Sequence, residues 1–288
     1  MYRQFYGIRH HPFTLTPDPR FLYTSASVRQ ALAGLAHCVR RRSGFLMLSG
    51  EVGTGKTTLL RSLMDSLQRA QWPSAFLVNP TLRPNELLEY VTADLGVPVT
   101  GGSKSALLFA LSTWLVKLNA EGKTATVIID EAHALSDETL EEIRFLTNLE
   151  TSDAKLVQVI LAGQPELVDR LEQPHLRQIK QRLYLRCALL PLTREEVGSY
   201  VNRRLLLAGT QAPAIFTAEA INALHRFSGG IPRVINTLCE HALINGFAHS
   251  RKPLHAADIE EVAIEFGFAH EVPTEDSLQP RLVGLGQR

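Results

Sequence analysis

The chain has 288 residues, of which 45% are hydrophobic and 20% are charged, and its 30 Lys and Arg nearly balance 29 Asp and Glu at a formal net charge of +1. This composition is typical of a globular protein with a buried core and excludes a disordered or fibrous chain. The near-zero charge excludes a global basic field for non-specific nucleic-acid binding, and no stretch reaches the roughly 18 consecutive apolar residues of a membrane span.

The cysteines and the first residues bear on location. Cys38, Cys187 and Cys239 are far apart and form no Cys-x-x-Cys pair, which favours a reducing compartment. Residues 1–10 lack the apolar core of a signal peptide. We therefore expect a cytoplasmic chain that does not itself insert into a membrane.

Prolines dominate the N-terminal segment. Pro12, Pro17 and Pro19 fix φ and remove backbone donors, so residues 11–23 are predicted to be extended or turned. We expect residues 1–26 to form an extended wrap on the domain that follows.

Strand and helix patterns alternate over the next part of the chain. Continuously apolar runs predict strands at 45–49, 75–78, 125–130, 156–162 and 183–189, and apolar residues at helical spacing predict helices at about 27–40, 57–69, 85–95, 105–121 and 137–149. Strands separated by helices of this length indicate βαβ crossovers. The predicted fold is a three-layer α/β/α parallel sheet occupying residues 1–190.

Only helical signals follow residue 190. Thr193 and Glu196 form a capping box that predicts a helix to about residue 207, Thr217 caps a second helix that ends at Gly229, and Pro232 begins a third that runs to about residue 247. A last helix is predicted at 256–266. We expect residues 191–268 to form a small all-helical lid domain and residues 269–288 to form a flexible tail.

A phosphate-binding motif joins the first strand to the next helix. It consists of Gly50, Glu51, Val52, Gly53, Thr54, Gly55, Lys56 and Thr57, followed by Thr58, and fits the pattern G-x-x-x-x-G-K-[ST]. Glycines let backbone N–H groups surround phosphates, the helix N-terminus adds positive charge, and Lys56 reaches the β and γ phosphates. The Thr57 hydroxyl can ligate Mg²⁺, so the motif predicts a nucleoside triphosphate site.

Two carboxylates follow the strand at 125–130. Asp130 and Glu131 are expected at the carboxyl end of the sheet, where they would face the phosphates. Asp130 is predicted to hold Mg²⁺, and Glu131 to polarise the attacking water, because phosphoryl transfer needs mainly positioning and charge compensation.

Polar and basic residues complete the candidate site. Gln164 follows the next strand and could orient the water, although a simple turn before Pro165 is the alternative. Arginine compensates transition-state charge, and an arginine from a neighbouring subunit makes hydrolysis depend on assembly. We favour Arg182 over Arg177 for this role, with a solvated helix face as the alternative. Arg233 lies in the first turn of a helix, where a cation favours an anionic partner such as a nucleotide phosphate.

These motifs, in this order, resemble those of AAA+ ATPases, in which a helical lid bearing a Gly-x-Pro-Arg sensor follows the nucleotide domain. The segments Phe5-Tyr-Gly, Pro12-Phe-Thr-Leu-Thr-Pro, Ile129-Asp-Glu-Ala, Gly163-Gln-Pro-Glu-Leu and Gly229-Gly-Ile-Pro-Arg are similar to the ExeA/GspA class of bacterial general secretory pathway ATPases. The resemblance covers about residues 1–268.

The resemblance implies ATP and Mg²⁺ as cofactors, and it implies self-assembly into a ring or helical homo-oligomer. It implies that Gln164 is a first sensor, Arg233 a second sensor and Arg182 an arginine acting in trans. A membrane protein of a secretion or envelope system is the implied partner. Longer members of the class continue through a membrane segment, whereas this sequence ends in a Pro- and Gly-containing segment, so we expect peripheral association with the inner membrane through a partner.

A second function stays open at this point. The class also resembles, more distantly, the TnsC, TniB and MuB types of ATPase that regulate transposition and assemble on DNA. This alternative predicts double-stranded DNA and a transposase as partners. The near-neutral charge favours the secretion role, and the run Arg40-Arg41-Arg42 favours the DNA role.

Overall fold

The computed structural model describes residues 1–78, 81–210 and 215–268, and it divides them into two compact units. One unit, here called the sheet unit, is Pro17–Leu190. The other, the helical unit, combines Met1–Thr16 with the chain from Pro191 onward. The predicted tail at residues 269–288 lies outside the described residues.

The sheet unit is built on five strands, β1 (Phe45–Gly50), β2 (Ser74–Leu77), β3 (Ala125–Ile129), β4 (Val157–Gly163) and β5 (Leu183–Leu189). Their order is β2-β3-β4-β1-β5, and every neighbouring pair is parallel. Strands β3 and β4 are buried along their whole length, as expected for a sheet covered on both faces. The predicted parallel α/β sheet is confirmed.

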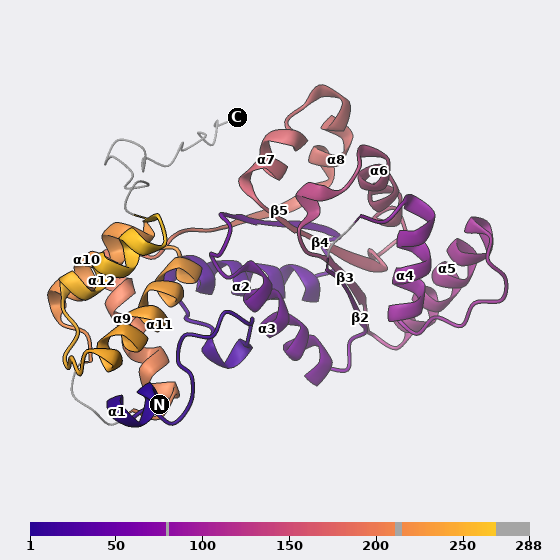
Figure 1. The fold of residues 1–288 in the computed structure, drawn as a ribbon. Helices are drawn as coiled ribbons and strands as arrows, with labels where there is room; N and C mark the ends of the chain where they lie inside the picture. Colours follow the sequence, from indigo (N-terminus) through magenta and orange to yellow (C-terminus); the bar gives the residue numbers. More distant parts are fainter. Residues whose placement is uncertain (79–80, 211–214, 269–288) are drawn as a thin grey trace. The chain divides into compact units, whose positions relative to one another are not determined.

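Helices cover both faces of this sheet (Figure 1). Their bounds are α2 (Ala26–Arg40), α3 (Lys56–Arg69), α4 (Pro84–Asp94), α5 (Lys104–Ala120), α6 (Asp137–Leu146), α7 (Pro165–Leu171) and α8 (Arg177–Arg182), with 3₁₀ turns η1 (Pro19–Phe21), η2 (Ala132–Ala134) and η3 (Pro174–Leu176). Helices α2 and α3 pack with Leu46 and Leu48 on one face, and α4 to α8 pack with Phe45 and Met47 on the other. The alternating side chains of β1 thus reach two separate apolar cores.

The sequence interpretation predicted no helix at α7 and considered a helix at α8 only as the alternative setting of Arg177 and Arg182. Helices α7 and α8 have seven and six residues, too few for apolar periodicity to be recognised. Helix α6 also ends at Leu146, three residues before the predicted end, where the Thr147 hydroxyl donates to the Arg144 carbonyl at 2.7 Å.

Residues 11–23 are extended or turned as predicted, with one 3₁₀ turn at Pro19–Phe21, but the predicted wrap over residues 1–26 needs correction. Residues 1–26 do not form an extended wrap, because α1 (Tyr2–Tyr6) is helical and residues 1–16 belong to the helical unit. The Tyr6 hydroxyl donates to the Arg251 carbonyl at 2.9 Å, and the Tyr2 hydroxyl donates to Glu240 at 2.6 Å. The buried Arg204 guanidinium donates to the Pro12 carbonyl at 2.6 Å. These contacts bind the segment to distant helices, so sequence-local signals could not locate it.

Four further helices form the described part of the helical unit from residue 191 to residue 268, which agrees with the predicted helical region. They are α9 (Arg194–Leu207), α10 (Ala218–Ser228), α11 (Pro232–Ala248) and α12 (Ala256–Glu265). The capping box of Thr193 and Glu196 begins α9, and the Thr217 hydroxyl caps α10. Across the described ranges, every helix is too short or too polar to span a bilayer.

Candidate nucleotide site

The phosphate-binding motif forms the turn from β1 into α3. Gly53 and Gly55 have φ angles of 83° and 100°, the left-handed region that glycine adopts without steric cost. A Cβ at Gly50 would lie 2.9 Å from the Leu189 carbonyl oxygen and 2.9 Å from the Thr54 hydroxyl. The loop therefore requires glycine both for its curvature and for its close approach to β5.

Lys56 is buried at the start of α3. Its ammonium donates to the carbonyls of Gly50 at 2.7 Å and Glu51 at 3.0 Å, which holds it within the curve of the loop. Burial lowers the pKa of Lys56, and the charges of Glu131 and Asp130 oppose that shift. The predicted acidic pair, Asp130 and Glu131, therefore lies close enough to Lys56 to influence its pKa.

Asp130 extends from the carboxyl end of β3 toward the loop. Its Oδ2 accepts a 2.5 Å hydrogen bond from the Thr57 hydroxyl, and its Oδ1 accepts from the Glu131 backbone N–H at 3.0 Å. Asp130 is 1% exposed, and desolvation raises the pKa of its carboxyl despite those hydrogen bonds. The two predicted metal ligands, separated by 73 positions in sequence, thus meet in the fold.

This pair suits Mg²⁺. Its donors are a hydroxyl and a carboxylate oxygen, and the buried negative charge of Asp130 favours a nearby cation. Within the part of the chain that the structure describes, no group of three or more His, Cys, Asp and Glu side chains could hold a metal ion. One protein carboxylate is enough in phosphate sites, where Mg²⁺ takes its remaining ligands from phosphates and water.

Glu131 and Gln164 lie at the carboxyl ends of β3 and β4. Glu131 adopts a left-handed conformation with φ of 52°, and its side chain is 44% exposed. Gln164 is the N-terminal cap residue of α7, and its Nε2 lies 3.0 Å from Nε2 of His133. His133 Nδ1 lies 3.4 Å from Glu131 Oε2. The structure therefore places His133, to which the sequence analysis gave no role, between the two predicted residues.

The two candidate trans arginines lie elsewhere in the sheet unit. Arg182 ends α8 immediately before β5, Arg177 begins that helix, and both side chains are exposed. Leu183 pairs with Phe45 and Leu189 pairs with Gly50, so Arg182 is level with the amino end of β1. At about 3.3 Å per residue, this is roughly 17 Å along the sheet from the start of the phosphate loop.

Arg233, the predicted second sensor, belongs to the helical unit. It lies in the first turn of α11 directly after Pro232, and its side chain is exposed. Its backbone carbonyl accepts a hydrogen bond from the Thr237 hydroxyl at 3.1 Å. A sensor role for Arg233 stays a prediction.

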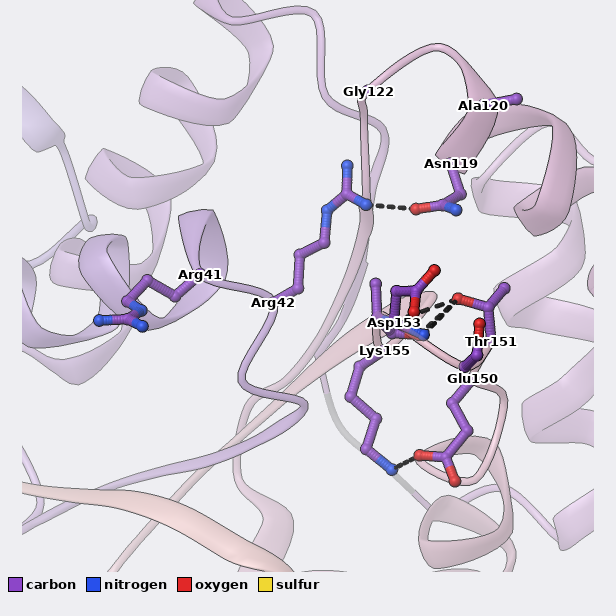
Figure 2. A pocket seen from close by; sticks show the side chains of 11 residues that line it. Arg41, Arg42, Asn119, Ala120, Gly122, Glu150, Thr151, Asp153 and Lys155 are labelled. Atoms are coloured by element: carbon purple, nitrogen blue, oxygen red, sulfur yellow. Dashed lines mark hydrogen bonds and ion pairs between the residues drawn. The ribbon is translucent and has the colours of Figure 1, made fainter.

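A polar pocket of about 680 Å³ lies at the amino ends of the strands, opposite the edge that carries the phosphate loop. Figure 2 shows Arg42, Asn119, Glu150 and Lys155 around it, from segments that precede β1, β3 and β4. Arg42 donates to the Asn119 side chain and Lys155 pairs with Glu150, so two of its cations already have partners. The pocket lies away from the phosphate loop, which follows the carboxyl end of β1.

The parallel sheet, the phosphate loop and the strand-end acidic pair are the features of the P-loop AAA fold. Residues 39–171 match the sequence model of a family described as an AAA domain. It is also related to general secretion pathway protein A of Aeromonas hydrophila, with 42% identity over 286 residues. That match covers 99% of this chain and 52% of the relative, so the chain spans about half the relative's length.

Solved structures share the fold. The Aeropyrum pernix ORC2 protein, described as ADPNP–ADP complexes, matches with a TM-score of 0.65 and 17% identity over 88% of this chain and 71% of that chain. Cdc6p from Pyrobaculum aerophilum matches with a TM-score of 0.66 and 17% identity over 93% and 74%. The RuvB Holliday junction branch migration motor of Thermotoga maritima matches with a TM-score of 0.58 and 14% identity over 88% and 73%. At these identities the likeness shows the fold alone.

Proposed function

We propose that this chain is a Mg²⁺-dependent ATP hydrolase that converts ATP and water to ADP and phosphate, assembles into oligomers with ATP bound, and assists a secretion or cell-envelope assembly system. The observation that carries the proposal is the 2.5 Å hydrogen bond between Thr57 and Asp130. Because these two groups are in contact, the hydroxyl of the phosphate loop and the strand-end carboxylate could both bind one cation next to Lys56, which supports the proposal.

The residues of the site divide the work of hydrolysis. Backbone N–H groups of residues 50–57 would bind the phosphates, and the Lys56 ammonium would exchange the carbonyls of Gly50 and Glu51 for phosphate oxygens. Thr57 and Asp130 would hold Mg²⁺, which neutralises charge on the β and γ phosphates when bound. Glu131, partly exposed beside them, would accept the proton of the attacking water.

The register of β5 supports a role for Arg182 between subunits. Because Arg182 lies roughly 17 Å along the sheet from the phosphate loop of its own chain, it would compensate charge on the nucleotide of a neighbouring chain. Hydrolysis would then depend on assembly. Arg233 would contact a nucleotide phosphate from the first turn of α11.

The proposed biological setting is inferred from the similarity to general secretion pathway protein A. General secretion pathway protein A is named for a secretion pathway, and its identity with this chain extends over 286 residues. We therefore propose a membrane protein of a secretion or envelope system as the partner, with the chain in the cytoplasm at the inner membrane. The alternative function is ATP-dependent binding to double-stranded DNA together with a transposase. The salt dependence of DNA binding distinguishes this alternative from the secretion role.

The test uses two site variants and one matched control. Lys56→Ala is expected to abolish nucleotide binding, and Glu131→Gln is expected to bind ATP but to hydrolyse it at least about 100-fold more slowly. Arg69→Ala removes a cation from the other end of the same helix, α3, and should leave binding and turnover unchanged. Unchanged ATP affinity in Lys56→Ala would refute the phosphate-loop assignment, and near-normal turnover in Glu131→Gln would mean that another base acts.

A further inference from the structure

We infer that His133 is a positioning residue, which orients the Glu131 carboxylate and connects it to Gln164. The inference rests on the proposed function, because it assigns a role within the same hydrolytic site. Three observations carry it, namely the hydrogen-bond geometry of the imidazole, the burial of its Nδ1 atom and the bracing of the η2 segment.

The contact with Gln164 sets the tautomer of the ring. His133 Nε2 lies 3.0 Å from the amide nitrogen Nε2 of Gln164. With the amide nitrogen of Gln164 placed toward the ring, the amide donates and the imidazole Nε2 accepts. In the neutral ring the proton then resides on Nδ1. The histidine therefore accepts on the side of Gln164 and donates on the opposite side.

The donating side of the ring faces Glu131. Nδ1 of His133 is buried, has no hydrogen-bond partner among the described residues, and lies 3.4 Å from Glu131 Oε2. A buried N–H without a partner is unfavourable, and a small rotation of the Glu131 side chain would satisfy it. The opposite tautomer would set a nitrogen lone pair against the carboxylate. Hydrogen-bond donation thus runs in one direction, from the Gln164 amide to the imidazole and from the imidazole toward the Glu131 carboxylate.

The backbone around His133 is held in place. Arg170 of α7 donates to the carbonyl oxygens of His133 at 3.2 Å and Leu135 at 2.5 Å, and it pairs with Asp137. A Cβ at Gly163 would lie 3.3 Å from the His133 backbone nitrogen, so the end of β4 packs directly against η2. The imidazole consequently has a fixed base, which a residue that positions another side chain requires.

This arrangement has a mechanistic consequence. Gln164 lies at the strand end where it would contact the attacking water or the γ phosphate, and any shift of its amide changes the hydrogen bond to His133. His133 would transmit that shift to the carboxylate that accepts the proton. The site would then hydrolyse ATP efficiently only when Gln164 is engaged, since a base misplaced by about 1 Å loses roughly 100-fold in rate.

Three substitutions at His133 separate positioning from packing. His133→Asn keeps an N–H donor near the Nδ1 position, His133→Gln places its amide near the Nε2 position, and His133→Ala removes both. We expect kcat to fall about 10- to 100-fold in His133→Ala and His133→Gln, and less than about 10-fold in His133→Asn. The KM for ATP should stay within about threefold in all of them. His37→Asn, at an exposed position of α2, is the control.

A double-mutant cycle with Gln164→Ala tests the connection. If His133 acts together with Gln164, replacing His133 by Ala in the Gln164→Ala background should cost a smaller factor in kcat than in the wild-type background. Fully multiplicative effects, His133→Gln as active as His133→Asn, or His133→Ala within about twofold of wild type would each overturn the inference. An ATP-binding wild-type chain without turnover would instead refute the proposed hydrolase, so the two failures are distinguishable.

Discussion

Gly246 in α11 offers a quantitative test of how the N-terminal segment packs on the helical unit. A Cβ at this position would lie 2.3 Å from the Tyr6 hydroxyl and 2.4 Å from a methyl carbon of Leu254, and both of those side chains are fully buried. Neither can move into solvent, so Gly246→Ala must displace Tyr6 from the hydrogen bond that it donates to the Arg251 carbonyl.

The expected destabilisation combines three terms. Overpacking a buried site costs about 1 to 3 kcal/mol, and the lost hydrogen bond adds about 0.5 to 1.5 kcal/mol. Alanine in place of glycine inside a helix recovers up to about 1 kcal/mol. We therefore expect Gly246→Ala to lower the free energy of unfolding by about 0.5 to 4.5 kcal/mol, even though alanine is the better helix former.

Urea unfolding followed by circular dichroism measures this difference, and the chain provides a matched control. Gly198 lies inside α9 of the same unit, where a Cβ would make an ordinary 3.4 Å contact with Ile221. Gly198→Ala should therefore stabilise the protein by up to about 1 kcal/mol. Adding Tyr6→Phe to Gly246→Ala removes the closest clashing atom and should restore part of the loss. A stabilising Gly246→Ala would refute this packing of α1.

Three further predictions concern the nucleotide site. Burial raises the pKa of Asp130, so the ionised carboxylate destabilises the folded protein at neutral pH. Asp130→Asn should therefore abolish ATP turnover and raise the thermal unfolding midpoint of the protein without nucleotide. A lower midpoint would contradict this reasoning. Arg182→Ala should reduce turnover at unchanged ATP affinity, and mixing it with Glu131→Gln subunits should restore activity; no recovery would remove the support for an arginine acting in trans. Glu131→Gln locked with ATP and Mg²⁺ should not bind double-stranded DNA near physiological salt, whereas tight binding with a steep negative salt slope would favour the transposition alternative.

The placement of the candidate residues at the carboxyl edge of the sheet was predictable from the sequence because it depends on local order. Each of Lys56, Asp130 and Gln164 follows a buried apolar run, and parallel strands deliver their carboxyl ends to one edge. That rule brings Thr57 to Asp130, 73 positions further along the chain, without any knowledge of the residues between them. The left-handed glycines of the loop follow from the motif in the same way.

Contacts between side chains that are remote in sequence were not predictable. Gln158 is a fully buried polar residue in the central strand β4, where its amide oxygen accepts from the Gly44 N–H at 2.6 Å and its nitrogen donates to Thr124 at 3.2 Å. Nothing near Gln158 in the sequence indicates those partners. His133 escaped notice for the same reason, because its significance arises only when the ends of β3 and β4 are adjacent.

Backbone conformation distinguishes Glu131 independently of the motif. The described residues include four non-glycine positions with positive φ, which are Arg42, Gln71, Glu131 and Ser250. Arg42, Gln71 and Ser250 each follow the last turn of a helix and donate to a carbonyl of that turn, the usual setting of a left-handed cap residue. Glu131 instead follows a strand, where a left-handed residue is unfavourable by about 1 to 3 kcal/mol unless its surroundings fix it. The hydrogen bond from its N–H to Asp130 helps to fix it, so the strain is retained where the carboxylate must face the phosphate loop.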